Sequence, residues 1–129
     1  MKAGNETVLF RHEKTFFNPT GLFVRVPDTL TAAEAAALTR QVAGYVVDYV
    51  GMHLRLDGVA VEAVSGSAAR FAETVAAVCA AATLPLILVT EDPAIMEAGL
   101  AKVVGVTPLL AAATAANCDA MAKLAKDAK

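Results

Sequence analysis

Short apolar runs alternate with Ala-rich helical segments along most of this chain. The first run covers residues 22–26, and three more follow at 59–64, 86–89 and 109–113. Most positions in each run are apolar, which is typical of a parallel strand with both faces buried. Strands and helices that alternate in this way predict βαβ units with right-handed crossovers. The pattern therefore predicts an α/β fold with four βα units.

The first helix is predicted to run from a cap at Thr31 to Gly51. Thr31 and Glu34 have the spacing of a capping box, in which each side chain binds a backbone N–H at the helix start. Apolar residues then recur at steps of three and four, which predicts one stripe that faces the sheet. Residues 52–57 are interpreted as extra chain before the second strand. The stripe consists of Leu38, Val42, Tyr45, Val46 and Tyr49.

Capping residues also follow the later apolar runs. Asp92 before Pro93 suits an N-cap and a first helical position, because proline has no N–H to lose there. Gly105 is predicted to end this third helix. The other caps are Ser67 for the second helix and Thr114 or Asn117 for the last helix.

The pattern divides the chain into an N-terminal extended segment, residues 1–21, and a (βα)4 domain, residues 22–129. Alternation over 8–17 predicts a strand or small hairpin that leads into the first parallel strand. Four βα units fit half of an eight-stranded TIM barrel, since an open sheet would leave two apolar strands at its edges. A small doubly wound sheet is the alternative, but no glycine-rich phosphate loop follows any strand.

Composition narrows the classes of function. The chain is 57% hydrophobic and 19% charged with a net charge of -2, which excludes global disorder, and it has no Lys/Arg cluster that would bind nucleic acid. The apolar stretch 75–89 is interrupted by Thr83 and Pro85 and is too short for a membrane span. We expect no export signal, because the N-terminus leads into a charged segment. The two cysteines, Cys79 and Cys118, are predicted to be buried free thiols, which indicates a cytoplasmic protein.

Several segments resemble one family, the large (gamma) subunit of the corrinoid iron-sulfur protein, which is also a subunit of the acetyl-CoA decarbonylase/synthase complex. The resemblance runs from about Glu6 to Lys126, and it implies that the chain is the first half of a central TIM barrel. Ala111 and Cys118 depart from the residues expected in that family. The segments that carry the resemblance are 8–20, 84–88, 91–93, 108–110, 112–114 and 117–121.

The resemblance implies a methyl carrier of the reductive acetyl-CoA pathway. Such a subunit has an N-terminal [4Fe-4S] domain and a C-terminal cobamide domain around the barrel, and it pairs with a small subunit that is itself a barrel. Residues 1–21 contain no Cys-rich motif, and we expect no cobamide-type domain in this chain. We therefore expect no cofactor on this chain, with cobamide and [4Fe-4S] held by other domains.

Polar residues at the carboxyl ends of the predicted strands are the candidate site. Two of these residues are adjacent carboxylates, and the set has no histidine, lysine or arginine to activate a reaction. His12 and His53 lie elsewhere without metal-ligand spacing. We therefore expect no catalytic, cofactor-binding or metal residue. The candidates for contact at this end are Ser65, Thr90, Glu91, Asp92, Thr114 and Asn117, with Asp28 and Ser67 beside them.

The leading hypothesis is a non-catalytic scaffold within a methyl-transfer complex. Two alternatives are a small α/β enzyme that acts through Glu91 or Asp92 and a purely structural interaction module. The half-barrel predicts a partner, either a second copy that closes a pseudo-barrel or the rest of the subunit together with the small barrel subunit. The inner layer that the partner would cover is predicted to contain Val24, Val61, Leu88 or Ile87, and Leu110.

Overall fold

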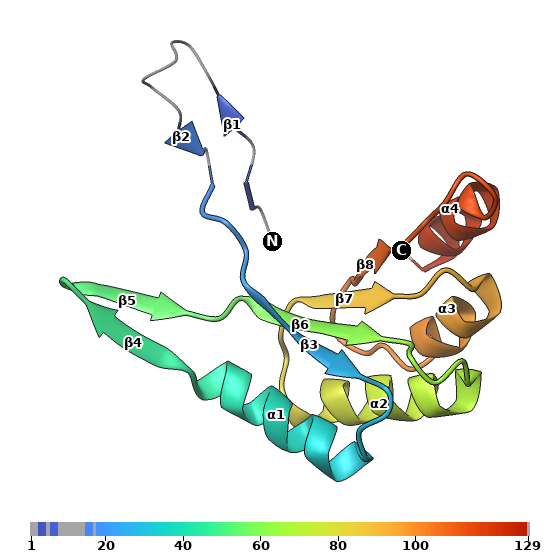
Figure 1. Ribbon diagram of the computed structural model, residues 1–129, viewed down its shortest axis with the longest axis horizontal. Helices are drawn as coiled ribbons and strands as arrows, with labels where there is room; N and C mark the ends of the chain where they lie inside the picture. Colours follow the sequence, from blue (N-terminus) through green and yellow to red (C-terminus); the bar gives the residue numbers. More distant parts are fainter. Residues whose placement is uncertain (1–2, 5, 8–14, 17, 129) are drawn as a thin grey trace.

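The computed structural model describes residues 3–4, 6–7, 15–16 and 18–128. Its centre is a four-stranded parallel sheet with helices between successive strands (Figure 1). The predicted α/β fold with four βα units is confirmed. The strands of this sheet are β3 (Phe23–Pro27), β6 (Gly58–Glu62), β7 (Leu86–Val89) and β8 (Leu109–Ala111). The helices are α1 (Ala32–Gly44), α2 (Ala68–Ala81), α3 (Pro93–Leu100) and α4 (Cys118–Asp127).

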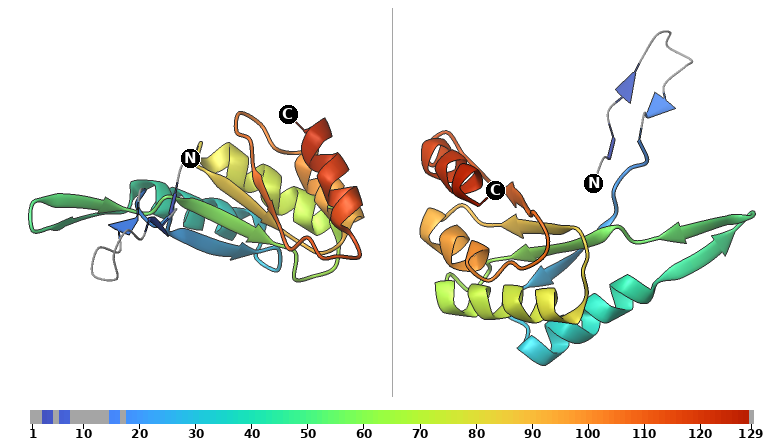
Figure 2. Two further views of the ribbon diagram at one scale, coloured as in Figure 1. Left: turned by 90° about the horizontal axis from the view of Figure 1, so that it is seen from above. Right: turned by 180° about the vertical axis from the view of Figure 1, so that it is seen from behind.

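The strands lie side by side in the order of the chain, β3-β6-β7-β8, and all pairs are parallel. Because each right-handed crossover steps in the same direction, the connecting helices fall on one face. Helices α1, α2 and α3 pack in sequence along that face, and α4 contacts α3 (Figures 1 and 2). A doubly wound sheet reverses its order and carries helices on both faces. The arrangement is therefore that of half a barrel.

The hydrophobic core lies between the sheet and the helices. Val26, Val59 and Val61 from the strands meet Phe71 and Val75 of α2, and all five side chains are fully buried. The stretch 75–89, which has the highest density of apolar residues, is the end of α2 followed by β7. No helix among the described residues is long and apolar enough to span a membrane.

The residues predicted for the inner, open face of the sheet lie mostly on the opposite face, which the helices cover. Register places Val24 opposite Val59, and Val61 opposite Leu88, on the face that the helices cover. Leu110 also packs against the core, so only the alternative Ile87 faces the other way. The face without helices carries the alternate residues of the strands: Phe23, Arg25, Ala60, Glu62, Ile87, Val89, Leu109 and Ala111.

The first helix is shorter than predicted. Helix α1 ends at Gly44, and the chain then forms an antiparallel hairpin of β4 (Val46–Tyr49) and β5 (Met52–Arg55). The segment that follows Gly44 is rich in β-branched and aromatic residues, which favour a strand when a partner strand is available. Residues 52–55 supply that partner, so they are not merely extra chain. The hairpin projects from the body beyond the amino ends of β3 and β6 (Figure 1).

Helix α3 and strand β8 also end earlier than predicted. Helix α3 stops at Leu100 instead of Gly105, because the next N–H groups close a tight turn on Gly99 and Leu100. Strand β8 stops at Ala111, since Ala112 has a left-handed φ of 74° and turns the chain out of the sheet. The expected caps are confirmed for three helices: Thr31 with Glu34, Ser67, and Asp92 with Pro93.

The N-terminal segment contains a small antiparallel ladder between β1 (Glu6–Thr7) and β2 (Thr15–Phe16). Hydrogen bonds from the Gly4 N–H to the Pro19 carbonyl and from the Asn18 N–H to the Gly4 carbonyl extend it toward the domain. The expectation of a strand or hairpin before β3 is confirmed. The charged run that contains His12 lies outside the described residues.

Candidate functional site

The polar residues predicted at the strand ends lie at one end of the sheet, where β3, β6, β7 and β8 all terminate. Parallel strands make this convergence unavoidable, because their carboxyl ends share an edge. The site divides into a buried cluster after β3 and β6 and an exposed cluster after β7 and β8.

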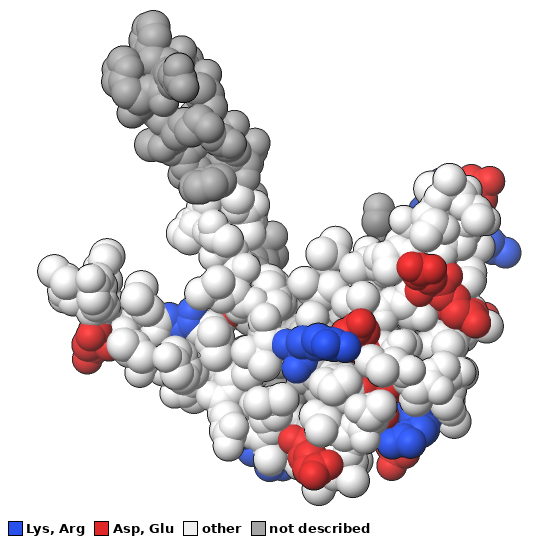
Figure 3. Space-filling view, in the orientation of Figure 1, with Lys and Arg blue, Asp and Glu red and all other residues white. Residues whose placement is uncertain are grey.

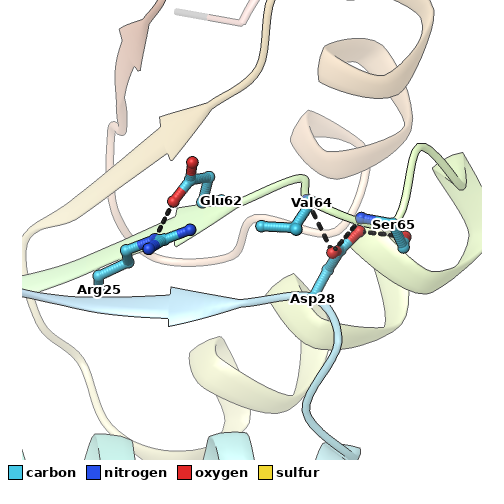
Figure 4. A network of polar contacts seen from close by, with 5 residues as sticks. All are labelled: Arg25, Asp28, Glu62, Val64 and Ser65. Atoms are coloured by element: carbon cyan, nitrogen blue, oxygen red, sulfur yellow. Dashed lines mark hydrogen bonds and ion pairs between the residues drawn. The ribbon is translucent and has the colours of Figure 1, made fainter.

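The buried cluster is built around Asp28, whose side chain is fully buried at the end of β3. Its Oδ1 accepts hydrogen bonds from the backbone N–H groups of Val64 and Ser65, each at 2.8 Å. Its Oδ2 accepts the hydroxyl of Ser65 at 2.5 Å (Figure 4). One carboxylate therefore fixes the loop between β6 and α2 against the end of β3.

Burial alone would raise the pKa of Asp28, but the pKa lies below the usual 3.8. The lowering comes from the Ser65 hydroxyl, then from the N–H groups of Ser65 and Val64, and finally from the positive charge of Arg70. Each of these interactions favours the ionised carboxylate. Asp28 is thus a structural anion whose hydrogen-bonding capacity is committed to the loop.

The exposed cluster follows Thr90, which is itself buried at the end of β7 and accepts the N–H of Asp92 on its hydroxyl at 3.2 Å. Asp92 in turn accepts the N–H groups of Ala94 and Ile95 and starts α3. Glu91 lies between them with an exposed side chain. The two adjacent carboxylates therefore differ: Asp92 is engaged as a cap, and Glu91 faces solvent.

Asn117 joins the loop after β8 to the loop after β7. Its Oδ1 accepts the N–H of Thr114, and its Nδ2 donates to the carbonyl of Glu91, both at 2.6 Å. Asn117 stands at the N-cap position of α4 but makes no side-chain capping bond to the helix. Thr114 and Asn117 thus hold two neighbouring loops together.

Most of the polar side chains at this end of the sheet make capping or loop contacts. Within the described residues, no group of three or more His, Cys, Asp or Glu side chains is placed to hold a metal ion. His53 lies on the projecting hairpin, paired with Asp48. The prediction of two buried thiols was wrong for Cys118, which is exposed because α4 buries only Met121 fully; Cys79 is half-buried.

Sequence analysis missed an ion pair on the open face of the sheet. The guanidinium Nε of Arg25 on β3 contacts the carboxylate of Glu62 on β6 (Figure 4). The Arg25 side chain is 63% exposed and that of Glu62 is 33% exposed. Arg25 and Glu62 each interrupt an otherwise apolar strand, and a single charged residue in such a strand is the sequence signal that could have indicated the pair. The pair forms a polar layer near the carboxyl ends of the strands.

The opposite half of the open face is apolar. An open cavity of about 600 Å³ lies at the amino ends of β7 and β8. The open face therefore has an apolar half and a charged half. The cavity lining includes Phe23, Leu84, Pro85, Ile87, Val106 and Leu109.

Comparison with known proteins places this architecture in a family. The model of the CO dehydrogenase/acetyl-CoA synthase delta subunit family matches residues 1–129. The chain belongs to this family. The resemblance noted in the sequence to the corrinoid iron-sulfur protein large (gamma) subunit is also confirmed by individual relatives.

Among these relatives, the corrinoid/iron-sulfur protein large subunit of Moorella thermoacetica is 39% identical over 127 residues, which is 98% of this chain and 28% of that protein. The acetyl-CoA decarbonylase/synthase complex subunit gamma of Archaeoglobus fulgidus is 44% identical over 129 residues, or 100% of this chain and 27% of that protein. The corresponding subunit of Methanopyrus kandleri is 43% identical over 126 residues, or 97% and 27%. This member of the CO dehydrogenase/acetyl-CoA synthase delta subunit family thus spans just over a quarter of the length of these relatives.

Proposed function

We propose that this chain is the first half of the TIM barrel of a corrinoid iron-sulfur subunit in an acetyl-CoA decarbonylase/synthase complex, where it acts as a scaffold. The observation that carries the proposal is the open face of the sheet. Helices cover only one face, and in the described part of the chain β3 and β8 each pair on one side only. A barrel needs four more strands to cover that face and pair both edges.

The chemistry of the open face supports a protein partner that continues the sheet. Leu109 is 62% exposed and lines the apolar cavity with Ile87 and Phe23. Covering several hundred Å² of such surface contributes on the order of 10 kcal/mol before the costs of association. That value is comparable to the stability of a whole small domain. The relatives contain enough additional chain to supply the missing strands.

In this proposal the chain itself binds neither cobamide nor an iron-sulfur cluster. Its two cysteines are too few for the four thiolates of a [4Fe-4S] cluster. The loops at the carboxyl ends of the strands are held by Asp28 and Asn117 and present Ser65 and Glu91 to solvent. These loops form a rigid contact surface toward a cobamide on another domain, while the methyl group is carried by that cofactor.

A second candidate is self-closure, in which two copies form an eight-stranded pseudo-barrel. The two unpaired edges favour it, because a twofold axis would pair β3 of one copy with β8 of the other. In this arrangement the chain still acts as a scaffold, and the same face and edges are covered.

The test is complementation in trans. The chain is co-expressed with the segment that follows the matched region in the Archaeoglobus fulgidus gamma subunit, and the mass of the product is measured by light scattering on a sizing column. We expect a one-to-one complex in which amide hydrogens on the outer edges of β3 and β8 become protected from exchange. Leu109→Glu on the open face is expected to prevent the complex.

Two results distinguish the alternatives. A stable homodimer of the chain alone, with the same protected edges and the same sensitivity to Leu109→Glu, supports self-closure. A chain that stays monomeric in the presence of the second segment, with both edges unprotected, contradicts the half-barrel proposal.

A further inference from the structure

The guanidinium on the open face of the sheet has hydrogen-bond donors that the described chain does not use. The Nε atom of Arg25 on β3 contacts the carboxylate of Glu62 on β6 (Figure 4). Within the described residues, neither Nη atom of Arg25 makes a hydrogen bond. The Arg25 side chain is 63% exposed, so water reaches these donors while the face stays open. Figure 3 shows positive atoms beside negative atoms over the sheet, within a mostly uncharged surface.

Completion of the barrel, the proposed function on which this inference rests, would take that water away. The interior of a TIM barrel is a core packed with layers of side chains rather than a pore. Arginine keeps its charge in proteins, and a buried charged donor without an acceptor is costly. Glu62 faces only the Nε side of the group. The strands that complete the barrel are therefore expected to bring an acceptor to the Nη atoms.

The positions around the ion pair leave room for a side chain from the opposite wall of the barrel. Ala60 lies opposite Arg25 in the register of β3 with β6. Val89 lies opposite Glu62, and Ala111 lies opposite Val89 on the last strand. The interior of a small barrel is filled by side chains that alternate between small and large. Longer side chains of the completing strands are thus expected to extend toward the ion pair over the two alanines.

Charge balance determines the type of acceptor. Arg25 and Glu62 neutralise each other, and Arg25 is the only basic residue that the four described strands place on this face. A further carboxylate would leave the covered group with a net negative charge and no cation to compensate it. A side-chain amide or hydroxyl oxygen accepts the same N–H groups without adding charge.

We infer that the completing half of the barrel places a neutral oxygen acceptor, from an Asn, Gln, Ser or Thr side chain, against the Nη atoms of Arg25. Glu62 positions the guanidinium for this contact, because it holds Nε over β6. The open face then selects its partner at two levels, through the apolar cavity at the amino ends and through this contact nearer the carboxyl ends. The contact also fixes register, since a strand shifted by one residue would turn its acceptor to the other face.

The first experiment removes the ion pair from the one-to-one complex with the Archaeoglobus fulgidus segment. The double variant Arg25→Met with Glu62→Met removes both charges at similar volume. If only apolar residues covered the pair, this variant would bind equally well or more tightly, because well-packed apolar residues often replace a buried ion pair without loss. A partner acceptor would instead be left unpaired, so we expect the Kd to rise about 10- to 100-fold. Dilution of the complex, followed by fluorescence anisotropy of a labelled chain, measures the Kd.

Two single variants accompany the double variant. Arg25→Lys keeps a positive charge beside Glu62 but loses the planar fork, and it is expected to raise the Kd about tenfold. Glu73→Met is the control for loss of a charge. Helix α2, which carries Glu73 on its exposed side, packs between α1 and α3, so the added strands do not reach it and the Kd is expected to stay unchanged. Circular dichroism confirms that each variant remains folded.

Nitrogen-15 NMR of the guanidinium gives a second measurement that does not depend on the double variant. The signal of Arg25 is assigned as the one that Arg25→Lys lacks. In the chain alone the Nη protons are expected to exchange rapidly with water. In the complex we expect a resolved Nη signal with slower exchange, because the acceptor holds the group and water is excluded.

Three results overturn the inference while the complex still forms. They are a double variant that binds as tightly as the wild type or more tightly, Nη protons that exchange as fast in the complex as in the chain alone, and a rise in Kd above about 1,000-fold, which would indicate a charged acceptor. Failure to form any complex contradicts the half-barrel proposal, and the inference falls with it. The two are therefore distinguished by whether the wild-type complex forms.

Discussion

The carboxylate of Asp28 accepts the hydroxyl of Ser65 at 2.5 Å, although the two residues stand 37 positions apart in the chain. The same carboxylate accepts two backbone N–H groups of the loop after β6. Asp28 therefore connects the ends of two neighbouring strands and sets the shape of the surface that the strand ends present.

Asp28→Asn is expected to destabilise the chain by about 1–2 kcal/mol, because an amide replaces a charged acceptor of three hydrogen bonds. The pKa of Asp28 is lowered by folding, so its contribution to stability is complete above the usual pKa of 3.8 and is lost as pH falls through the folded value. Urea unfolding at several pH values measures this. The difference between the wild type and the variant is expected to be constant near neutrality and to shrink in acid.

Asp57→Asn is the control for this prediction. Asp57 accepts a single N–H, that of Leu22, at 2.7 Å. We expect a smaller loss of stability for this variant. Equal losses for Asp28→Asn and Asp57→Asn would contradict the special role of the buried carboxylate.

The start of α3 gives a second prediction. Asp92→Ala removes the acceptor for the N–H groups of Ala94 and Ile95 and is expected to cost about 1 kcal/mol in the free energy of unfolding. Glu91→Gln next to it changes an exposed side chain and is expected to have almost no effect. Chemical denaturation of both variants compares them, and an equally stable Asp92→Ala protein would show that the helix does not depend on this cap.

Local signals predicted the starts of three helices correctly. The capping box of Thr31 and Glu34 lies within four residues, and Asp92 and Pro93 are adjacent. Such contacts depend on neighbours in the chain, so they can be inferred without knowledge of the fold. The alternation of strands and helices was predictable for the same reason.

The hairpin could not be inferred from local spacing. Tyr45, Val46 and Tyr49 fit a helical stripe as well as a strand, and the choice depends on pairing with residues 52–55. Gly44 marked the true end of the helix, but Gly51 offered the same signal. A contact with a later segment decided between two endings that were equally acceptable locally.

Two other features could not be predicted from the sequence for a different reason. They are the choice of strand residues that face the helices and the ion pair between Arg25 and Glu62. A run such as 86–89 is apolar at every position, so it does not show whether Leu88 or Ile87 faces the helices. Arg25 and Glu62 stand 37 residues apart, and only the parallel register of β3 with β6 brings them together. Long-range pairing thus determines the features of the open face.

The packing of α3 on α2 gives a third prediction. A Cβ atom added at Gly99 would lie within 3.0 Å of the ring of Phe71, which is fully buried, so the ring or the helix would have to shift. Gly99→Ala is therefore expected to destabilise the chain by about 1–3 kcal/mol despite the better helix propensity of alanine. Gly44→Ala at the end of α1 is the control, since a Cβ there meets nothing within 4 Å and is expected to add up to about 1 kcal/mol. Thermal unfolding measures the stability of both variants. If both were more stable than the wild type, the result would contradict the close approach of α3 to α2.

The hairpin turn gives a fourth prediction. Val50 and Gly51 both have positive φ, which for a two-residue loop favours Asn-Gly. Val50→Asn is expected to stabilise the hairpin by about 1 kcal/mol, because asparagine tolerates the left-handed region. Hydrogen exchange of the β4 and β5 amides, at about 1 micromolar so that association is negligible, measures this. Val47→Asn within β4 is the control, and it is expected not to stabilise the hairpin. If exchange slowed in Val47→Asn but not in Val50→Asn, the result would contradict the assigned turn.

The ion pair between Arg25 and Glu62 links stability to completion of the barrel. In the chain alone both side chains contact solvent, and an exposed pair contributes at most about 1 kcal/mol. Once further strands cover the open face, removing one partner would leave the other charge buried, which costs about 3–5 kcal/mol. Glu62→Gln is therefore expected to be nearly neutral in the isolated chain and strongly destabilising in the one-to-one complex with the completing segment. Urea unfolding of both forms tests this, with Glu73→Gln on the exposed side of α2 as the control that is neutral in both. An equal, small effect of Glu62→Gln in the two forms would mean that the added strands do not cover the face on which this pair lies.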